Sequence, residues 1–173
     1  MTSPEPLIAC LLEIERYVQH GGWDQPARLF ALVPTAELVA AEPGLAEQLN
    51  AESAPPDALS SIEQDGVELR SAAGEDLLAG LEHISWPATV FGCALAVERT
   101  FLPPALEAQI PDDPAEAARF VARHPDRQEV RVVVGATRDG AGHGVGRLRA
   151  SGDLFGDPNL VPGLARALAR TLD

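Results

Sequence analysis

Residues 128–150, QEVRVVVGATRDGAGHGVGRLRA, decide the fold that this sequence predicts. The segment VRVVV at 130–134 is rich in β-branched residues, which favour an extended, pleated backbone. The segment DGAG at 139–142 supplies glycines, which adopt the positive φ angles that a tight turn requires. The whole stretch therefore predicts a β-hairpin.

The two faces of this hairpin indicate how its strands pair. A loop at residues 140–142 gives one face of small and apolar residues, namely Val132, Val134, Ala136, Gly146, Leu148 and Ala150. The other face is basic and carries Arg131, Thr137, His143, Val145, Arg147 and Arg149. An even-numbered loop would set Val132 opposite Arg149 and mix core with solvent on one face. Because a slip by one residue moves every side chain to the opposite face, we expect the loop at 140–142.

The composition indicates one acidic globular domain. The chain has 173 residues, 46% of them hydrophobic, which suffices for one core. All 13 basic residues are arginine, and the net charge of −13 argues against binding to nucleic acid or to an anionic membrane. Positive charge is concentrated in the hairpin, because residues 127–150 hold 5 Arg against 2 acids.

The two cysteines and the N-terminal segment indicate the compartment. Cys10 and Cys93 each lie in an apolar run, and they are too few for a disulfide framework, so we expect buried free thiols in a reducing environment. The N-terminal segment lacks a basic leader, and Glu13 and Glu15 interrupt its apolar residues, so we expect neither a signal peptide nor a membrane span. The prediction is a cytoplasmic protein.

The first half of the chain predicts helices around one buried strand. A helix is expected from Ser3-Pro4, with Ser3 as its cap, to Gly21-Gly22. The run RLFALV at 28–33 is apolar on both faces, as expected of a strand inside a sheet, and Thr35 is expected to cap the next helix. Two further segments complete this half: a mobile connection at about 51–73 with an extended piece at 67–69, and a short helix at 75–84.

The second half predicts a long strand, a helix, the hairpin and a last helix. In the strand at 89–101, Gly92, Ala94 and Ala96 share one side, which lets a helix approach closely, so we expect this strand in the centre with both faces covered. Asp113 is expected to cap a helix that ends before His124-Pro125. The C-terminal helix is indicated by one apolar stripe, Leu160, Leu164, Leu168 and Leu172.

These elements predict a single α+β domain spanning residues 1–173. We expect two layers, in which helices pack on a mostly antiparallel sheet of about four strands. The connection at 51–73 does not separate two domains, because the segments on either side of it complete one sheet.

The basic face of the hairpin is the first candidate site. Arg131, Arg147 and Arg149, with His143 beside them, could dock an anion or an acidic partner, since arginine pairs well with carboxylates. The same arginines could instead pair across strands with the chain's own acids, such as Glu98 or Glu129. The sequence leaves both interpretations open.

A second candidate is the neighbourhood of His124, His143 and Arg131, where a small-molecule binder or an enzyme would have a base and a cation. The histidines lack metal-ligand spacing, and the glycines of GHGVG at 142–146 open a hairpin strand rather than a helix, unlike a phosphate-binding loop. No catalytic motif is present. We therefore expect no catalytic residue, no metal site and no cofactor.

Three segments carry a resemblance to a known family: IERYVQHGGWDQPARLFALVPTAELVAAEP from residue 14, ISWP with GCALAVERTFLPP from residue 84, and HPDRQEVRVVVGATRDG from residue 124. Together they resemble a family of small, acidic actinobacterial proteins of unknown function. The resemblance implies a cytoplasmic, stand-alone domain and brings no activity or site residue. The layout is also loosely similar to secretion-chaperone-like domains, which bind partner segments.

The absence of a chemical motif from a complete domain favours a non-enzymatic protein-binding or adaptor module. We expect its partner to be another protein or a second copy of the chain, through the sheet or an exposed helix face. The alternative is the ligand binder or enzyme at His124, His143 and Arg131.

Overall fold

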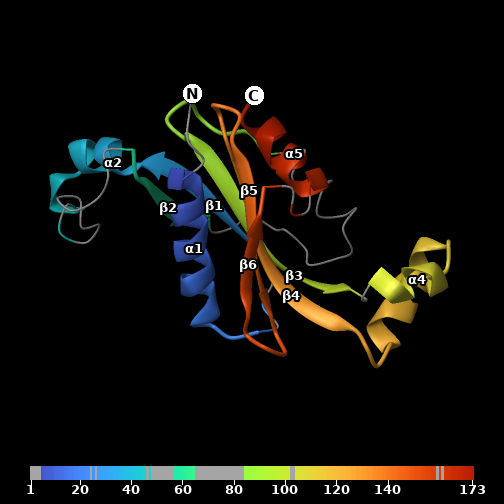
Figure 1. Ribbon diagram of the computed structural model, residues 1–173. Helices are drawn as coiled ribbons and strands as arrows, with labels where there is room; N and C mark the ends of the chain where they lie inside the picture. The colour runs from blue at the N-terminus through green and yellow to red at the C-terminus, as the bar shows by residue number, and fades with distance from the viewer. Residues whose placement is uncertain are drawn as a thin grey trace.

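In the computed structural model, an antiparallel sheet of six strands runs through the protein with helices on both of its faces (Figure 1). The structure describes residues 5–23, 25, 27–45, 47, 57–64, 84–101, 104–158, 160 and 162–173. The strands are β1 (Arg28–Pro34), β2 (Leu59–Glu63), β3 (Gly92–Phe101), β4 (Gln128–Thr137), β5 (Gly142–Leu148) and β6 (Leu154–Asp157). Their order across the sheet is β2-β1-β3-β4-β5-β6.

The helices divide between the two faces of the sheet. They are α1 (Glu5–Gln19), α2 (Thr35–Ala41), α4 (Pro114–Arg123) and α5 (Pro162–Thr171), with short 3-10 helices η1 (Pro43–Leu45) and η2 (Pro104–Gln109). Helix α1 covers one face and α5 the other, while α4 lies beyond the ends of β3 and β4 (Figure 1). We call the two sides of the sheet the α1 face and the α5 face.

Each face of the sheet has its own apolar core, because strands β1, β3 and β4 carry apolar residues at both odd and even positions, which point to opposite faces. On the α5 face, Leu95 and Val134 pack with Leu164 and Leu168 of α5. On the α1 face, the core consists of Leu7, Cys10, Leu11, Ile14 and Val18 of α1 with Phe30, Leu32, Leu59, Ala94, Ala96, Val133 and Val145. The small residues of β3 therefore do face a helix, as the sequence predicted.

The predicted two-layer domain with about four strands is wrong in both numbers, although the α+β class and the antiparallel sheet stand. The sheet has six strands, and helices on both faces make three layers. The sequence did not predict the edge strands β2 and β6, because they are short and lack a long apolar run. Strand β2 lies inside the connection predicted at 51–73, and it pairs with β1.

The hairpin has the predicted faces but a different loop. Thr137 N–H donates to the carbonyl of Ala141 at 3.0 Å, and Gly140 N–H donates to that of Thr137 at 3.1 Å, so the loop is 138–140 rather than 140–142. Gly140 takes a φ of 90°, the left-handed conformation that such a loop requires. Because the loop moves by two residues, each side chain of the hairpin stays on its predicted face. Val132 therefore keeps its face but pairs with Gly146 rather than Ala150.

Of the predicted helix caps, the one at Asp113 forms and the one at Thr35 does not. The Asp113 carboxylate accepts a hydrogen bond from Glu116 N–H at 3.1 Å, as predicted for the start of α4. The predicted Thr35 cap is wrong, because Pro34 precedes the first residue of α2 and the Thr35 hydroxyl bonds to Ser60 Oγ at 2.8 Å. The predicted Ser3 cap, the extended piece at 67–69 and all of the helix at 75–84 except Ile84 lie outside the described residues.

Close contact of α1 with the sheet predicts a difference between two glycines. A Cβ at Gly135 would lie 2.8 Å from Leu11 Cδ2 and 3.0 Å from Leu7 Cδ1, whereas one at Gly142 would have its nearest neighbour at 3.9 Å. Overpacking of this kind costs about 1–3 kcal/mol, so we expect Gly135→Ala to lower the free energy of unfolding in urea by that amount. The matched Gly142→Ala variant should change it by less than about 0.5 kcal/mol. Equal effects would contradict the close approach of α1.

Candidate functional site

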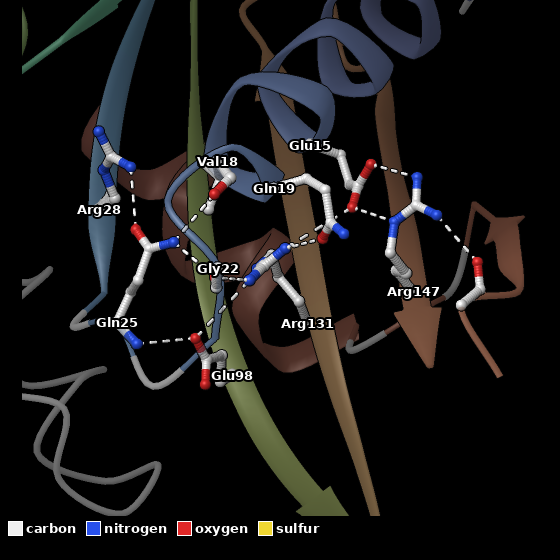
Figure 2. Close-up of polar contacts among 10 residues, drawn as sticks. Glu15, Val18, Gln19, Gly22, Gln25, Arg28, Glu98, Arg131 and Arg147 are labelled. Carbon is white, nitrogen blue, oxygen red and sulfur yellow. Dashed lines mark hydrogen bonds and ion pairs between the residues drawn. The ribbon is translucent and has the colours of Figure 1, made fainter. Parts of the chain in front are cut away.

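Arg131, the central residue of the predicted basic face, lies inside the protein with 1% of its surface exposed. Its guanidinium sits on the α1 face of β4, beneath the C-terminal end of α1 (Figure 2). Nη1 donates to Gln19 Oε1 at 2.7 Å, and Nη2 donates to the carbonyl of Gly22. The cation also stacks on Trp23, with Cζ 4.4 Å from the ring centroid.

Two carboxylates balance the charge of this guanidinium. Glu15 Oε1 lies 3.8 Å from Nη1, and Glu98 Oε2 lies 3.9 Å from Nη2. Desolvation by burial lowers the pKa of Arg131, and the negative charges of Glu98 and Glu15 oppose that shift. A buried cation of this kind is tolerated because it has both hydrogen-bond acceptors and opposite charge around it.

Glu15 is shared between two arginines. It is 1% exposed, and it accepts hydrogen bonds from Arg147 Nε at 2.6 Å and Nη2 at 2.8 Å in a bidentate pair. This hydrogen bonding raises the pKa of Arg147. Arg147 Nη1 also donates to the carbonyl of Gly152 at 2.8 Å, so the side chain links α1 to the turn between β5 and β6.

The segment after α1 is held over the buried guanidinium by Gln25. Its backbone N–H donates to Glu98 Oε2 at 2.8 Å, and its side-chain amide donates to the carbonyls of Val18 at 2.9 Å and Gly22 at 2.7 Å (Figure 2). Arg28 Nη1 donates to Gln25 Oε1 at 3.0 Å. The carbonyl that receives Arg131 is thereby fixed in position.

The Arg28 guanidinium extends the network to the edge strand β2. It pairs with the Glu63 carboxylate, with Nε donating to Oε2 at 2.6 Å and Nη2 to Oε1 at 2.6 Å. Hydrogen bonds from Arg28 lower the pKa of Glu63, although both side chains are partly exposed, which limits the energetic value of the pair. The network thus runs across the α1 face from β2 to the turn that precedes β6.

The arginine network supports the pairing interpretation for the predicted site. Arg131 faces Glu98, and Arg149 Nη1 lies 2.9 Å from Glu129 Oε2, as that interpretation named them. An anion reaching Arg131 would have to displace Gln19 and the Gly22 carbonyl, which leaves Arg149 the most accessible arginine of the set.

The predicted neighbourhood of His124, His143 and Arg131 is not brought together. His143 on β5 pairs with Gly135, and the Cα of Gly135 lies roughly 13 Å from that of Arg131, four residues away along β4. His124 lies at the end of α4, where Nδ1 accepts a hydrogen bond from Asp126 N–H at 3.0 Å. Burial lowers the pKa of His143, and Asp157 opposes that shift. These positions give the three side chains no common site.

Other places where chemistry or ligand binding could occur are the two cysteines, clusters of metal-ligating side chains and cavities. Cys10 and Cys93 are buried free thiols, as predicted. Within the ranges that the structure describes, no group of three or more His, Cys, Asp or Glu side chains is placed to hold a metal ion. A cavity of about 230 Å³ lies between α1, the end of β1 and the β4–β5 loop. Its lining is mainly apolar and includes Leu7, Leu59 and Phe91, but none of the predicted site residues.

The edge strand β6 is an exposed feature that the sequence did not predict. All four of its residues are exposed, and Leu154 and Phe155 keep 46% and 37% of their surface in solvent. Over the described part of the chain, β6 pairs with β5 alone. The sequence signal was the apolar pair Leu154-Phe155 between two Gly/Asp dipeptides, which is too short for a periodic pattern to reveal.

The pattern of hydrogen bonds between β5 and β6 determines which backbone groups of β6 point away from the sheet. Leu148 N–H donates to the carbonyl of Asp153 at 2.9 Å, which makes these two residues a hydrogen-bonded pair. Such pairs alternate along an antiparallel ladder, so Phe155 and Asp157 turn their backbone groups toward β5. Leu154 and Gly156 therefore direct their N–H and C=O groups to the outer edge.

The comparisons with known proteins identify one family. The sequence model of the family described as PPA1309-like protein matches residues 7–173. No curated protein and no solved structure matches the chain. A search of the described residues finds no helix that is long and apolar enough to span a membrane.

The buried network predicts that two similar carboxylates differ in their value for stability. Removing the charge of Glu15 leaves two arginines under-compensated at a buried position, so Glu15→Gln should lower the free energy of unfolding by about 3 kcal/mol in denaturant titrations. Glu129→Gln removes an exposed partner of Arg149 and should cost less than about 1 kcal/mol. A cost for Glu15→Gln as small as that for Glu129→Gln would show that the cluster is hydrated.

The thiols should be inert in the folded protein. Burial, with a smaller contribution from Glu13, raises the pKa of Cys10 to about 12, and burial raises that of Cys93 to about 11. Because the thiolate is the reactive form, we expect neither thiol to react with an aromatic disulfide reagent at about pH 8, and both to react after unfolding. Rapid labelling of either cysteine without denaturant would contradict this prediction.

Proposed function

We propose that this chain, which belongs to the PPA1309-like protein family, is a non-enzymatic protein-binding module that takes an extended segment of a partner onto the edge strand β6. The observation that supports the proposal is the exposed, outward-facing edge of β6 with its adjacent apolar side chains. Partner-strand addition at a sheet edge is a general mode of peptide recognition.

Backbone geometry supplies the binding energy in this mode. An edge strand presents N–H and C=O groups that can template another strand, and on β6 the outward groups are those of Leu154 and Gly156. The short length of β6 limits pairing to a short segment, so side-chain contacts must contribute as well. Four large hydrophobic residues are exposed in the described part of the chain, and two of them, Leu154 and Phe155, are neighbours on β6.

We also propose that the module acts in the cytoplasm of an actinobacterium. The buried free thiols support a reducing compartment. The use of Arg without any Lys, together with many Ala, Gly and Pro, supports the GC-rich coding of such organisms.

Selection of short peptides on the purified full chain tests the proposal. We expect selected peptides to shift the amide signals of Leu154 and Gly156 in NMR titrations and to slow the hydrogen exchange of these amides. Gly156→Pro removes an outward N–H without removing a bond to β5, and it should weaken peptide binding by about tenfold or more.

A matched substitution at the opposite edge of the sheet is the control. Leu154→Lys should weaken peptide binding, whereas Ile62→Lys, at a residue of β2 that is similarly exposed (41%), should leave it unchanged. Urea unfolding verifies that each variant retains the fold. Selected peptides that map away from β6, or that bind Gly156→Pro as tightly as the wild type, would overturn the proposed function.

A further inference from the structure

The side of β6 that faces the same way as α5 carries an apolar residue between two acids. Side chains alternate along a strand, so Asp153, just before β6, shares this side with Phe155 and Asp157. The Phe155 ring lies over Gly146, where a Cβ would be 2.6 Å from the ring carbon Cζ, and it still exposes 37% of its surface. Both aspartates are exposed.

The side chains of Asp153, Phe155 and Asp157 would contact those of a strand added to this edge. In such a ladder Leu154 and Gly156 would form the hydrogen bonds to the added strand, so Asp153, Phe155 and Asp157 would fall at its non-hydrogen-bonded positions. Opposite residues at such positions approach most closely, with Cα atoms about 4.5 Å apart. The residues facing them in the partner lie at positions i, i+2 and i+4 of its segment.

A second copy of this chain does not suit the edge. Antiparallel pairing of two β6 strands through both Leu154 and Gly156 sets Phe155 opposite Phe155, but it also sets Asp153 of each copy opposite Asp157 of the other. Like charges directly opposite one another destabilise a strand pair, and the net charge of −13 on each chain adds to the repulsion.

We infer that β6 selects a segment of another protein with the pattern basic–x–apolar–x–basic. The inference rests on the proposed function and specifies the partner: an apolar residue covers Phe155, and a basic residue pairs with each of Asp153 and Asp157. The pattern reads the same in both directions, so it holds for antiparallel and parallel addition alike. The acidic net charge steers such a segment toward the protein.

Three synthetic peptides of equal length, with the central sequences RTVTR, TRVRT and ETVTE between identical flanks, test this inference on the full chain. RTVTR presents both arginines on the side of β6 that bears the aspartates, while TRVRT has the same composition and turns them to the opposite side. We expect RTVTR to bind about three- to tenfold more tightly than TRVRT, because two cross-strand ion pairs are gained, and ETVTE to bind most weakly. Fluorescence anisotropy at low ionic strength gives the three affinities.

Variants of the two aspartates assign the preference to this site. Asp153→Asn with Asp157→Asn should remove the advantage of RTVTR over TRVRT. The control, Asp57→Asn with Asp112→Asn, removes the same charge from two exposed acids outside β6 and should preserve that advantage. Its persistence in both double variants would overturn the inference, as would equal affinities for RTVTR and TRVRT.

The outcomes distinguish this inference from the proposed function on which it rests. Peptides that shift the Leu154 and Gly156 amides with no preference for basic flanks would overturn the basic–x–apolar–x–basic pattern and leave strand addition at β6 standing. If neither these peptides nor selected ones reach β6, the proposed function fails and the pattern fails with it.

Discussion

The structure depends on how one buried cation, Arg131, is compensated. Its position on the α1 face follows from the alternation of β4, in which Val130, Val132 and Val134 occupy the α5 face. A guanidinium at that position requires acceptors, and it receives them from the last turn of α1 and from the segment that follows. The path of the chain from α1 to β1 is therefore tied to a single side chain in the hairpin more than a hundred residues later.

The compensation is matched in charge, although the buried Nε of Arg131 has no hydrogen-bond partner among the residues that the structure describes. Arg131 and Arg147 face Glu15 and Glu98, so the four side chains sum to zero. Desolvation offsets most of what such a cluster contributes, whereas loss of one member leaves an uncompensated buried charge. We therefore expect the cluster to select one placement of α1 on the sheet rather than to raise the overall stability. A purely apolar interface would allow α1 to slide more readily.

The sequence predicted what is encoded by sustained periodicity and missed what depends on distant partners. The apolar stripe of the C-terminal helix, the strands at 28–33 and 128–137 and the Asp113 cap all follow from local patterns. Strands β2 and β6 have too few residues for a pattern, and their conformation follows from the edge that they cover. The alternation of side chains along the strands identified which residues share a face with Arg131. It cannot distinguish an arginine that faces solvent from one that is covered by the end of a helix 112 residues away.

The arginine cluster and the support of the edge strand β6 meet at Arg147. On β5 this residue pairs with Leu154, and its guanidinium is bound to Glu15 and to the carbonyl of Gly152. The turn before β6 is thereby attached to α1, so the edge strand is presented from a fixed support. Pre-organisation of this kind reduces the conformational entropy lost when a flexible segment binds. The buried charges would thus assist recognition without touching the partner, because they keep the outward groups of Leu154 and Gly156 in position.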